Sequence, residues 1–335
     1  MMIVEFLSYL LFPGVLLTLY LSLASSWLYR KLVARMENRV GPPFNQPVFD
    51  VAKLMAKERM YPKKANYWIM HYLPRIQVGI ALLITLFIPL TGTRGLLSFQ
   101  GDLFVVLFLI TLHGSTSFFI GTASRNPYTI SGAGRAVFTE ISLELPLSLG
   151  FAGMAVMTGT MRIAEISLEI DRLFWQSWNS VILLIPWLIL LISVLYATLG
   201  ACELNPFSAA HAETEIVEGW SVELSGADLA YARIAEYVDL FSLSGLIAAL
   251  FLGGPIILEL EADTGFNQFV IGLVAFLTMI IKIGIILFLL AFIATTNSRL
   301  RIDQITDVLW SLILPSVIIA FGLIIVINIP GGMIG

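Results

Sequence analysis

Long runs of apolar residues, separated by shorter polar segments, dominate the pattern along this chain of 335 residues. A helix needs about 20 apolar residues to cross the roughly 30 Å hydrocarbon layer of a bilayer. The runs are continuously apolar rather than alternating, which excludes a transmembrane β-barrel. The pattern therefore predicts an all-α, polytopic membrane protein with one transmembrane domain over residues 1–335. Eight runs are long enough to span, at about 6–28, 72–91, 102–122, 136–159, 178–200, 236–257, 268–294 and 306–329.

Two polar segments, residues 29–71 and 201–235, are much longer than the others, and loops of this length are usually functional or disordered. In the first, the Gly-Pro-Pro stretch at 41–43 prevents helix formation. The run 48–58 that follows has apolar residues on one face, with Asp50, Lys53 and Lys57 on the other. We expect an amphipathic helix along the membrane interface. The alternative is that the basic residues of this loop serve only as positive-inside anchors.

Charged residues make up 13% of the chain, about half of the ~25% found in soluble domains. Fifteen lysines and arginines fall in loops on one side of the predicted spans and only three on the other. The positive-inside rule then places both long loops in the cytoplasm and both termini outside a prokaryotic cell membrane. The first residues lack a basic region and a cleavage site, so we expect the first span to be retained. Nothing in the pattern suggests nucleic-acid binding.

Metal and redox chemistry within this chain is not expected. The single Cys202 cannot form an internal disulfide or hold an iron–sulfur cluster, and His71, His113 and His211 lack the spacing of metal ligands. Any redox cofactor must therefore belong to a partner subunit or be a small organic carrier.

The fourth predicted span carries two carboxylates, Glu140 and Glu144, which lie one turn apart on one helical face. Each would cost roughly 2.5–3.5 kcal/mol at the centre of a bilayer, so we expect both to face a polar interior. Pro146 removes a backbone hydrogen bond nearby and can admit water. The alternative is that both lie near the cytoplasmic end and pair with Arg135.

Two further spans carry charge. Glu236 and Asp239 lie on neighbouring turns at the start of the sixth span, and Lys282 lies deep in the seventh. A buried lysine needs a carboxylate partner or loses its proton. Lys282 is therefore either part of a relay that moves charge or one half of a static ion pair between two helices.

The second long loop is acidic. Large apolar residues, including Phe207, Ile216 and Trp220, are interleaved with its carboxylates, so we expect it to fold against the bundle or a partner. A solvated acidic surface is the alternative. Its closely spaced glutamates are Glu203, Glu213, Glu215, Glu218 and Glu223.

Residues 206–226 of this loop resemble, without a gap, the long cytoplasmic loop of the complex I subunit 1 family, whose bacterial members are called the H subunit. The usual loop reads Pro-Phe-Asp, then Glu-Gly-Glu-x-Glu-Leu-Val, then Gly-Phe-Asn-Val-Glu-Tyr. Three further segments are similar to the family in the right order: Gly41-Pro42 in the first loop, Ala235-Glu236-Tyr237 in the sixth span, and Arg299-Leu-Arg301-Ile-Asp303-Gln304 near the C-terminus.

The resemblance implies an eight-helix bundle that joins a soluble redox arm to antiporter-like membrane subunits through a path of buried carboxylates. By position, the path candidates are Glu144, Glu213, Glu215, Glu223, Glu236 and Lys282, to which helical spacing adds Glu140 and Asp239. The residues expected to dock the soluble arm are Arg35, Arg39, Asp50, Lys53, Lys57, Glu203, His211, Arg299, Arg301 and Asp303.

The departures from the family pattern concern quinone. The arginine that usually precedes Pro-Phe-Asp is missing, and Ser208, His211 and Ala212 replace Asp, Glu and Gly. These changes alter the charge where a quinone headgroup would lie. They favour the branch of ferredoxin-linked membrane-bound hydrogenases and their sulfur-reducing relatives, which the first loop at 39–43 also resembles.

That branch implies partners with hydrogenase-like large and small subunits, iron–sulfur clusters and a [NiFe] or derived centre, with ferredoxin as the electron donor. The complex would pump protons or sodium ions. Three alternatives stay open: a quinone-binding subunit of a complex I type oxidoreductase, a stand-alone secondary transporter, and a purely structural anchor.

Overall fold

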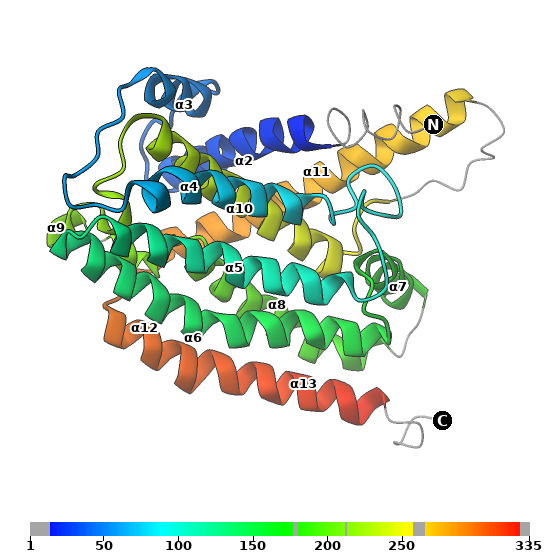
Figure 1. Cartoon of the computed structure of the whole chain (residues 1–335). Coiled ribbons are helices and arrows are strands. Elements are labelled where there is room, and N and C mark those ends of the chain that lie inside the picture. The colour runs from blue at the N-terminus through cyan, green and yellow to red at the C-terminus, as the bar shows by residue number, and fades with distance from the viewer. Residues whose placement is uncertain (1–13, 177–179, 212, 257–264, 329–335) are drawn as a thin grey trace.

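The computed structural model describes residues 14–176, 180–211, 213–256 and 265–328, and this part of the chain contains helices and no strands. The long helices run side by side (Figure 1). The short helices of both long loops and the start of α12 gather at one end of the bundle, and α7 lies at the other. The prediction of an all-α, polytopic membrane protein is confirmed.

Six helical segments of the described chain are long and apolar enough to cross a membrane. They are α5 (Asp102–Ala123), α6 (Pro127–Thr158), α8 (Ser180–Ala201), α10 (Gly226–Phe251), α11 (Gly265–Thr296), and a C-terminal span. The last joins α12 (Ile302–Val308), a π-helical turn (Leu309–Ile313) and α13 (Leu314–Asn328). At the two other predicted spans lie α2 (Val15–Met36) and α4 (Tyr67–Thr85). The first predicted span begins at residue 6, outside the described residues.

Two spans begin about ten residues earlier than the apolar pattern predicts. α6 starts at Pro127 rather than near 136, because Asn126 caps it by accepting a hydrogen bond from the Tyr128 amide, and proline suits the first helical position. α10 starts at Gly226 rather than near 236. Its first turns carry two charged residues, Asp228 and Arg233, and Asp228 forms a 3.0 Å ion pair with Arg75 of α4, so tertiary contacts help to set its start.

One helix lies outside all of the predicted apolar runs. α7 (Ile163–Gln176) buries Ile163, Ile166 and Ile170 against the bundle and exposes Glu165. It is amphipathic and too short to span, so it covers the end of the bundle opposite the long loops (Figure 1).

The core forms around α10, which packs against α2, α3, α4, α7 and α11. Every residue from Val238 to Phe251 is buried. A helix that is buried on all sides belongs to the interior of a bundle. Asp239 lies in this stretch, so its carboxylate needs polar neighbours within the protein.

Both long loops contain helices. The amphipathic helix predicted at 48–58 is observed as α3 (Gln46–Ala56), which is tied to α2 by a 3.2 Å ion pair between Arg30 and Asp50. The acidic loop forms three short helices, η1 (Ser208–His211), α9 (Glu213–Ile216) and η2 (Gly219–Ser221). Phe207 and Trp220 of this loop are buried against the bundle, as the apolar residues between its carboxylates predict.

Candidate functional site

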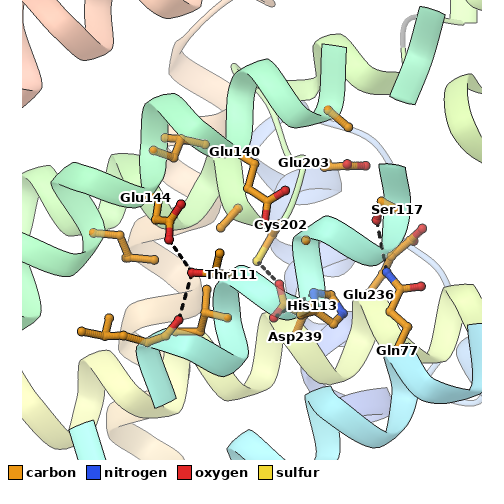
Figure 2. Close-up of a pocket in the computed structure, with 18 of the residues that line it drawn as sticks. Gln77, Thr111, His113, Ser117, Glu140, Glu144, Cys202, Glu203, Glu236 and Asp239 are labelled. Carbon is orange, nitrogen blue, oxygen red and sulfur yellow. Dashed lines mark hydrogen bonds and ion pairs between the residues drawn. The ribbon is translucent and has the colours of Figure 1, made fainter. Parts of the chain in front are cut away.

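A cavity of about 80 Å³ lies between α4, α5, α6, α8, α10 and the acidic loop. It is large enough for several water molecules, each of which needs about 10–15 Å³. Five carboxylates from α6, α10 and the segment after α8 line this cavity. Glu144 is exposed, whereas the other four are buried or half-buried, where an isolated charge is costly. The polar side chains that line it include Gln77, Thr111, His113, Ser117, Glu140, Glu144, Cys202, Glu203, Glu236 and Asp239 (Figure 2).

Glu140 and Glu144 project from α6 toward α5. Glu144 accepts a 2.5 Å hydrogen bond from the Thr111 hydroxyl. Glu140 lies against Gly114, where a Cβ atom would stand only 1.9 Å from its Oε1. This oxygen is buried and has no hydrogen-bond partner among the described residues. The missing side chain of Gly114 therefore makes the space for the Glu140 carboxylate.

Asp239 is approached from two sides by residues that the sequence did not single out as a site. The Cys202 thiol lies 3.7 Å from Asp239 Oδ2, and His113 Nδ1 lies 3.8 Å from Oδ1 (Figure 2). Across the cavity, Gln77 donates a 3.2 Å hydrogen bond to Ser117. One feature of the sequence could have indicated these cavity residues: His113 and Ser117 are polar and lie one turn apart within an apolar span.

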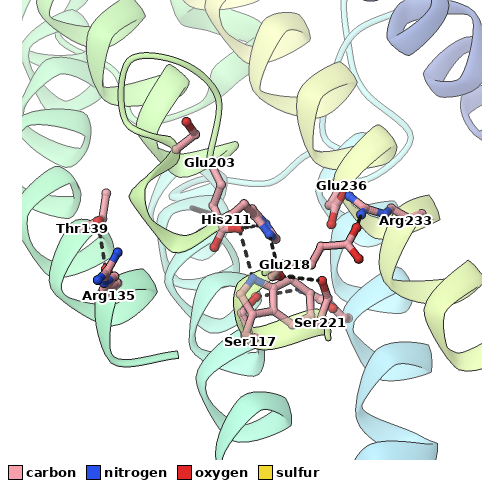
Figure 3. A network of polar contacts seen from close by, with 12 residues as sticks. Ser117, Arg135, Thr139, Glu203, His211, Glu218, Ser221, Arg233 and Glu236 are labelled. Atoms are coloured by element: carbon pink, nitrogen blue, oxygen red, sulfur yellow. Dashed lines mark hydrogen bonds and ion pairs between the residues drawn. The ribbon is translucent and has the colours of Figure 1, made fainter. Parts of the chain in front are cut away.

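Glu236 of α10 is connected to the acidic loop through Arg233. Arg233 Nη1 lies 3.0 Å from Glu236 Oε2, and its other terminal nitrogen pairs with the Glu218 carboxylate (Figure 3). The second oxygen of Glu236 is buried without a hydrogen-bond partner among the described residues. A loop residue and a cavity residue thus share one guanidinium.

A second connection runs through Glu203 and His211. The Glu203 carboxylate pairs with His211 Nε2 and accepts a 3.0 Å hydrogen bond from Trp220 Nε1. His211 Nδ1 lies 3.1 Å from the Glu218 carbonyl oxygen, an acceptor only (Figure 3). Burial works to lower the pKa of His211, but the Glu203 charge outweighs burial and raises this pKa to about 9. Burial alone would raise the pKa of Glu203, but the charge of His211 holds it below its ordinary value.

The His211–Glu203 pair predicts a pH dependence of stability. The pKa of His211 is about 9 in the folded chain against an ordinary value of 6.5, so its contribution is fully present below pH 6.5 and is lost as pH rises toward 9. The pKa of Glu203 is lowered, so its contribution is lost only in acid. The melting temperature of the purified protein should fall by several degrees from pH 7 to pH 9.5, more than that of His211→Gln. Parallel curves would contradict the pairing.

The structure brings together four of the eight coupling candidates, Glu140, Glu144, Glu236 and Asp239. Of the other four, Glu215, Glu223 and Lys282 are absent from the cavity lining. Glu215 forms a 2.5 Å ion pair with Arg135, so this arginine does not pair with Glu140 or Glu144 as the alternative expected. Glu223 accepts a 2.5 Å hydrogen bond from Asn126. Lys282 donates to the Leu252 and Gly254 carbonyls at 2.6 and 2.5 Å, and the side chain of Glu213 lies outside the described residues.

The docking candidates fall into two groups. Glu203 lines the cavity and pairs with His211, and their side chains are only 19% and 18% exposed. Arg299 donates to the Ser208 carbonyl and so fastens the C-terminal span to the acidic loop. The others lie toward the open surface of the same end of the bundle, where docking stays a prediction: Arg35, Arg39, Asp50, Lys53, Lys57, Arg301 and Asp303. Over the described residues, no three His, Cys, Asp or Glu side chains converge as a metal site.

Comparisons with known proteins agree with this architecture. The protein family described as "NADH dehydrogenase" matches residues 9–326 of this chain. The H subunit of NADH-quinone oxidoreductase from Brevibacillus brevis is 33% identical over 297 residues, 85% of this chain and 82% of the relative. Its counterpart from Bacteroides thetaiotaomicron is 30% identical over 308 residues, 90% of this chain and 85% of the relative. A chain of an archaeal respiratory complex, the membrane-bound sulfane sulfur reductase, has a TM-score of 0.83 at 26% identity, covering 96% of this chain and 99% of that one. The predicted family is thereby confirmed: the chain is a multi-pass membrane protein of the complex I-like kind and belongs to the NADH dehydrogenase subunit 1 family.

Proposed function

We propose that this chain is the membrane anchor and coupling subunit of a multisubunit pump in which electron transfer in a soluble arm drives proton or sodium translocation. The observation that carries the proposal is the carboxylate-lined, water-sized cavity, which is joined to an ordered acidic loop at two points. A static anchor needs no such cavity, because buried carboxylates are costly unless each is paired.

The two connections offer a route from the loop to the cavity. His211 joins the Glu203 carboxylate to the Glu218 carbonyl oxygen, and the Glu218 side chain reaches Glu236 through Arg233. A displacement of the loop around residue 218 would move partners of both cavity carboxylates together. In a low-dielectric interior such a change alters proton affinity strongly. The acidic loop would thus switch between two arrangements. Both the soluble arm and the ion-translocating membrane arm would shift the balance between them.

For the soluble arm, we favour the branch of ferredoxin-linked hydrogenases and sulfur-reducing complexes over the quinone-reducing branch. The likeness to a chain of a sulfane sulfur reductase supports this choice, as do Ser208 and His211 in place of the usual acidic residues. The cavity of about 80 Å³ is also smaller than the ~150 Å³ cavity that holds a benzene ring. The partners would then be hydrogenase-like subunits with iron–sulfur clusters, ferredoxin as donor, and antiporter-like membrane subunits, with the long loops cytoplasmic.

The names of the curated relatives support a second candidate, a quinone-binding subunit of an NADH:quinone oxidoreductase. Purification of the complex with its partners separates the two candidates. A [NiFe] or derived metal centre in the soluble arm would support the first, and tightly bound quinone or inhibition by quinone-site blockers would support the second. Ion transport by this chain alone in liposomes would instead indicate a secondary transporter.

Replacing Glu236 with glutamine tests coupling. Glutamine keeps the size of the side chain but removes its charge and its proton, so ions moved per electron in the reconstituted complex should fall by more than half while electron transfer continues. Glu165→Gln is the matched control, because Glu165 pairs with Arg162 at the opposite end of the bundle and does not line the cavity. An unchanged ion-to-electron ratio in Glu236→Gln would speak for a static anchor.

A further inference from the structure

A second pocket, of about 400 Å³, lies at the loop end between α6, the acidic loop and the start of the C-terminal span. Three arginines line it, Arg135, Arg299 and Arg301, against two carboxylates, Glu215 and Asp303. The lining thus carries a net positive charge, in a chain whose formal net charge is −4. The pocket is separate from the carboxylate cavity, and its lining includes none of the cavity residues.

The position of this pocket relative to the bilayer follows from the C-terminal span. Asp307 is the last charged residue of this span, and the 20 residues from 308 to 327 are long enough to cross the hydrocarbon. Arg301 and Asp303 stand one to two turns before it, at the depth of lipid headgroups. Just beyond them, Trp310 is 50% exposed on the outer surface of the bundle, and tryptophan favours this interfacial level.

Large apolar side chains are exposed on both of the helices that border the pocket. On α6, which packs beside α12 and α13, Phe138 and Ile141 are exposed. On the C-terminal span, Leu312 is exposed as well. We propose that the pocket binds the headgroup of an anionic phospholipid, whose acyl chains lie over these side chains.

Two of the three arginines are held in place before a ligand arrives. Arg299 donates to the Ser208 carbonyl, and Arg135 is fixed by its 2.5 Å ion pair with Glu215, while Arg301 is exposed. The lipid phosphate would accept from the remaining guanidinium N–H groups, each contact with a surface arginine being charge-assisted. Hydroxyl groups of a glycerol headgroup would donate to Glu215 and Asp303. A lipid in this place would fasten the acidic loop to the C-terminal span.

An acidic segment of a soluble partner is the competing occupant, and one experiment distinguishes the two. Phosphatidylglycerol is added to the delipidated, purified complex, and native mass spectrometry counts the bound molecules, with phosphatidylcholine as the zwitterionic comparison. The double variant Arg299→Gln with Arg301→Gln should bind phosphatidylglycerol on the order of tenfold more weakly. Arg59→Gln with Lys63→Gln removes the same charge elsewhere on the loops, at exposed residues outside the pocket, and should bind normally.

If both double variants bind phosphatidylglycerol equally weakly, the loss comes from the change in net charge alone and the proposal is wrong. Equal binding of the two lipids by the unmodified complex would also overturn it. Unchanged phosphatidylglycerol binding together with loss of the soluble subunits from Arg299→Gln/Arg301→Gln would assign the pocket to a protein partner instead.

Discussion

Replacing Gly219 with alanine is expected to detach the acidic loop from the bundle and prevent stable assembly. Gly219 has a φ of +63°, and a Cβ atom there would lie 1.8 Å from the Ala210 carbonyl oxygen. The left-handed conformation alone costs a non-glycine residue roughly 1–2 kcal/mol. The collision with backbone cannot be relieved by rotating a side chain, so η1 and η2 must separate. The melting temperature of the purified complex and the yield of assembled complex measure the effect.

Gly159→Ala provides the control for this prediction. Gly159 also has a positive φ, +74°, but a Cβ atom there would meet no other atom within 4 Å. It should therefore show the conformational cost without the collision. Equal losses in the two variants would mean that the close approach of Gly219 to Ala210 contributes nothing to holding the loop.

The sequence predicts most spans correctly because burial in hydrocarbon requires only a long apolar run, which is a local property. The same local argument identifies Glu140, Glu144, Glu236 and Asp239, since carboxylates at helical spacing must share a face. It fails for α7, whose apolar face is buried against other helices rather than in lipid.

The sequence does not place Glu203 in the cavity, because its position depends on how the loop folds. Glu203 itself has a φ of +53°, and its carboxylate meets His211 only after the chain has turned through η1. The hydrogen bond from Asn126 to Glu223 is equally non-local, because it joins residues 97 positions apart. Family position alone therefore grouped Glu215 and Glu223 with the buried carboxylates, although they lie outside the cavity lining.

The relation between Glu140 and Gly114 shows that the cavity depends on a missing side chain as much as on the charged ones. Charge and space can be altered separately there. Glu140→Gln removes the charge and keeps the shape, whereas Gly114→Ala keeps the charge but occupies the site of the carboxylate. The atoms that the new Cβ would meet are those of the Glu140 carboxylate, at the end of a flexible side chain. Gly114→Ala should therefore fold normally, with the Glu140 carboxylate displaced from the cavity.

Both Glu140→Gln and Gly114→Ala are expected to lower ion translocation per electron on the order of tenfold, the result of roughly 1.4 kcal/mol at the limiting step. Electron transfer and assembly should change little. The ratio of ions moved to electrons transferred in proteoliposomes is the measurement. Gly134→Ala on α6 is the matched control, since a Cβ atom there meets nothing within 4 Å and the gain in helix propensity is the same. If Gly114→Ala pumps as well as Gly134→Ala while Glu140→Gln does not, the charge of Glu140 is needed, but its position beside Gly114 is not.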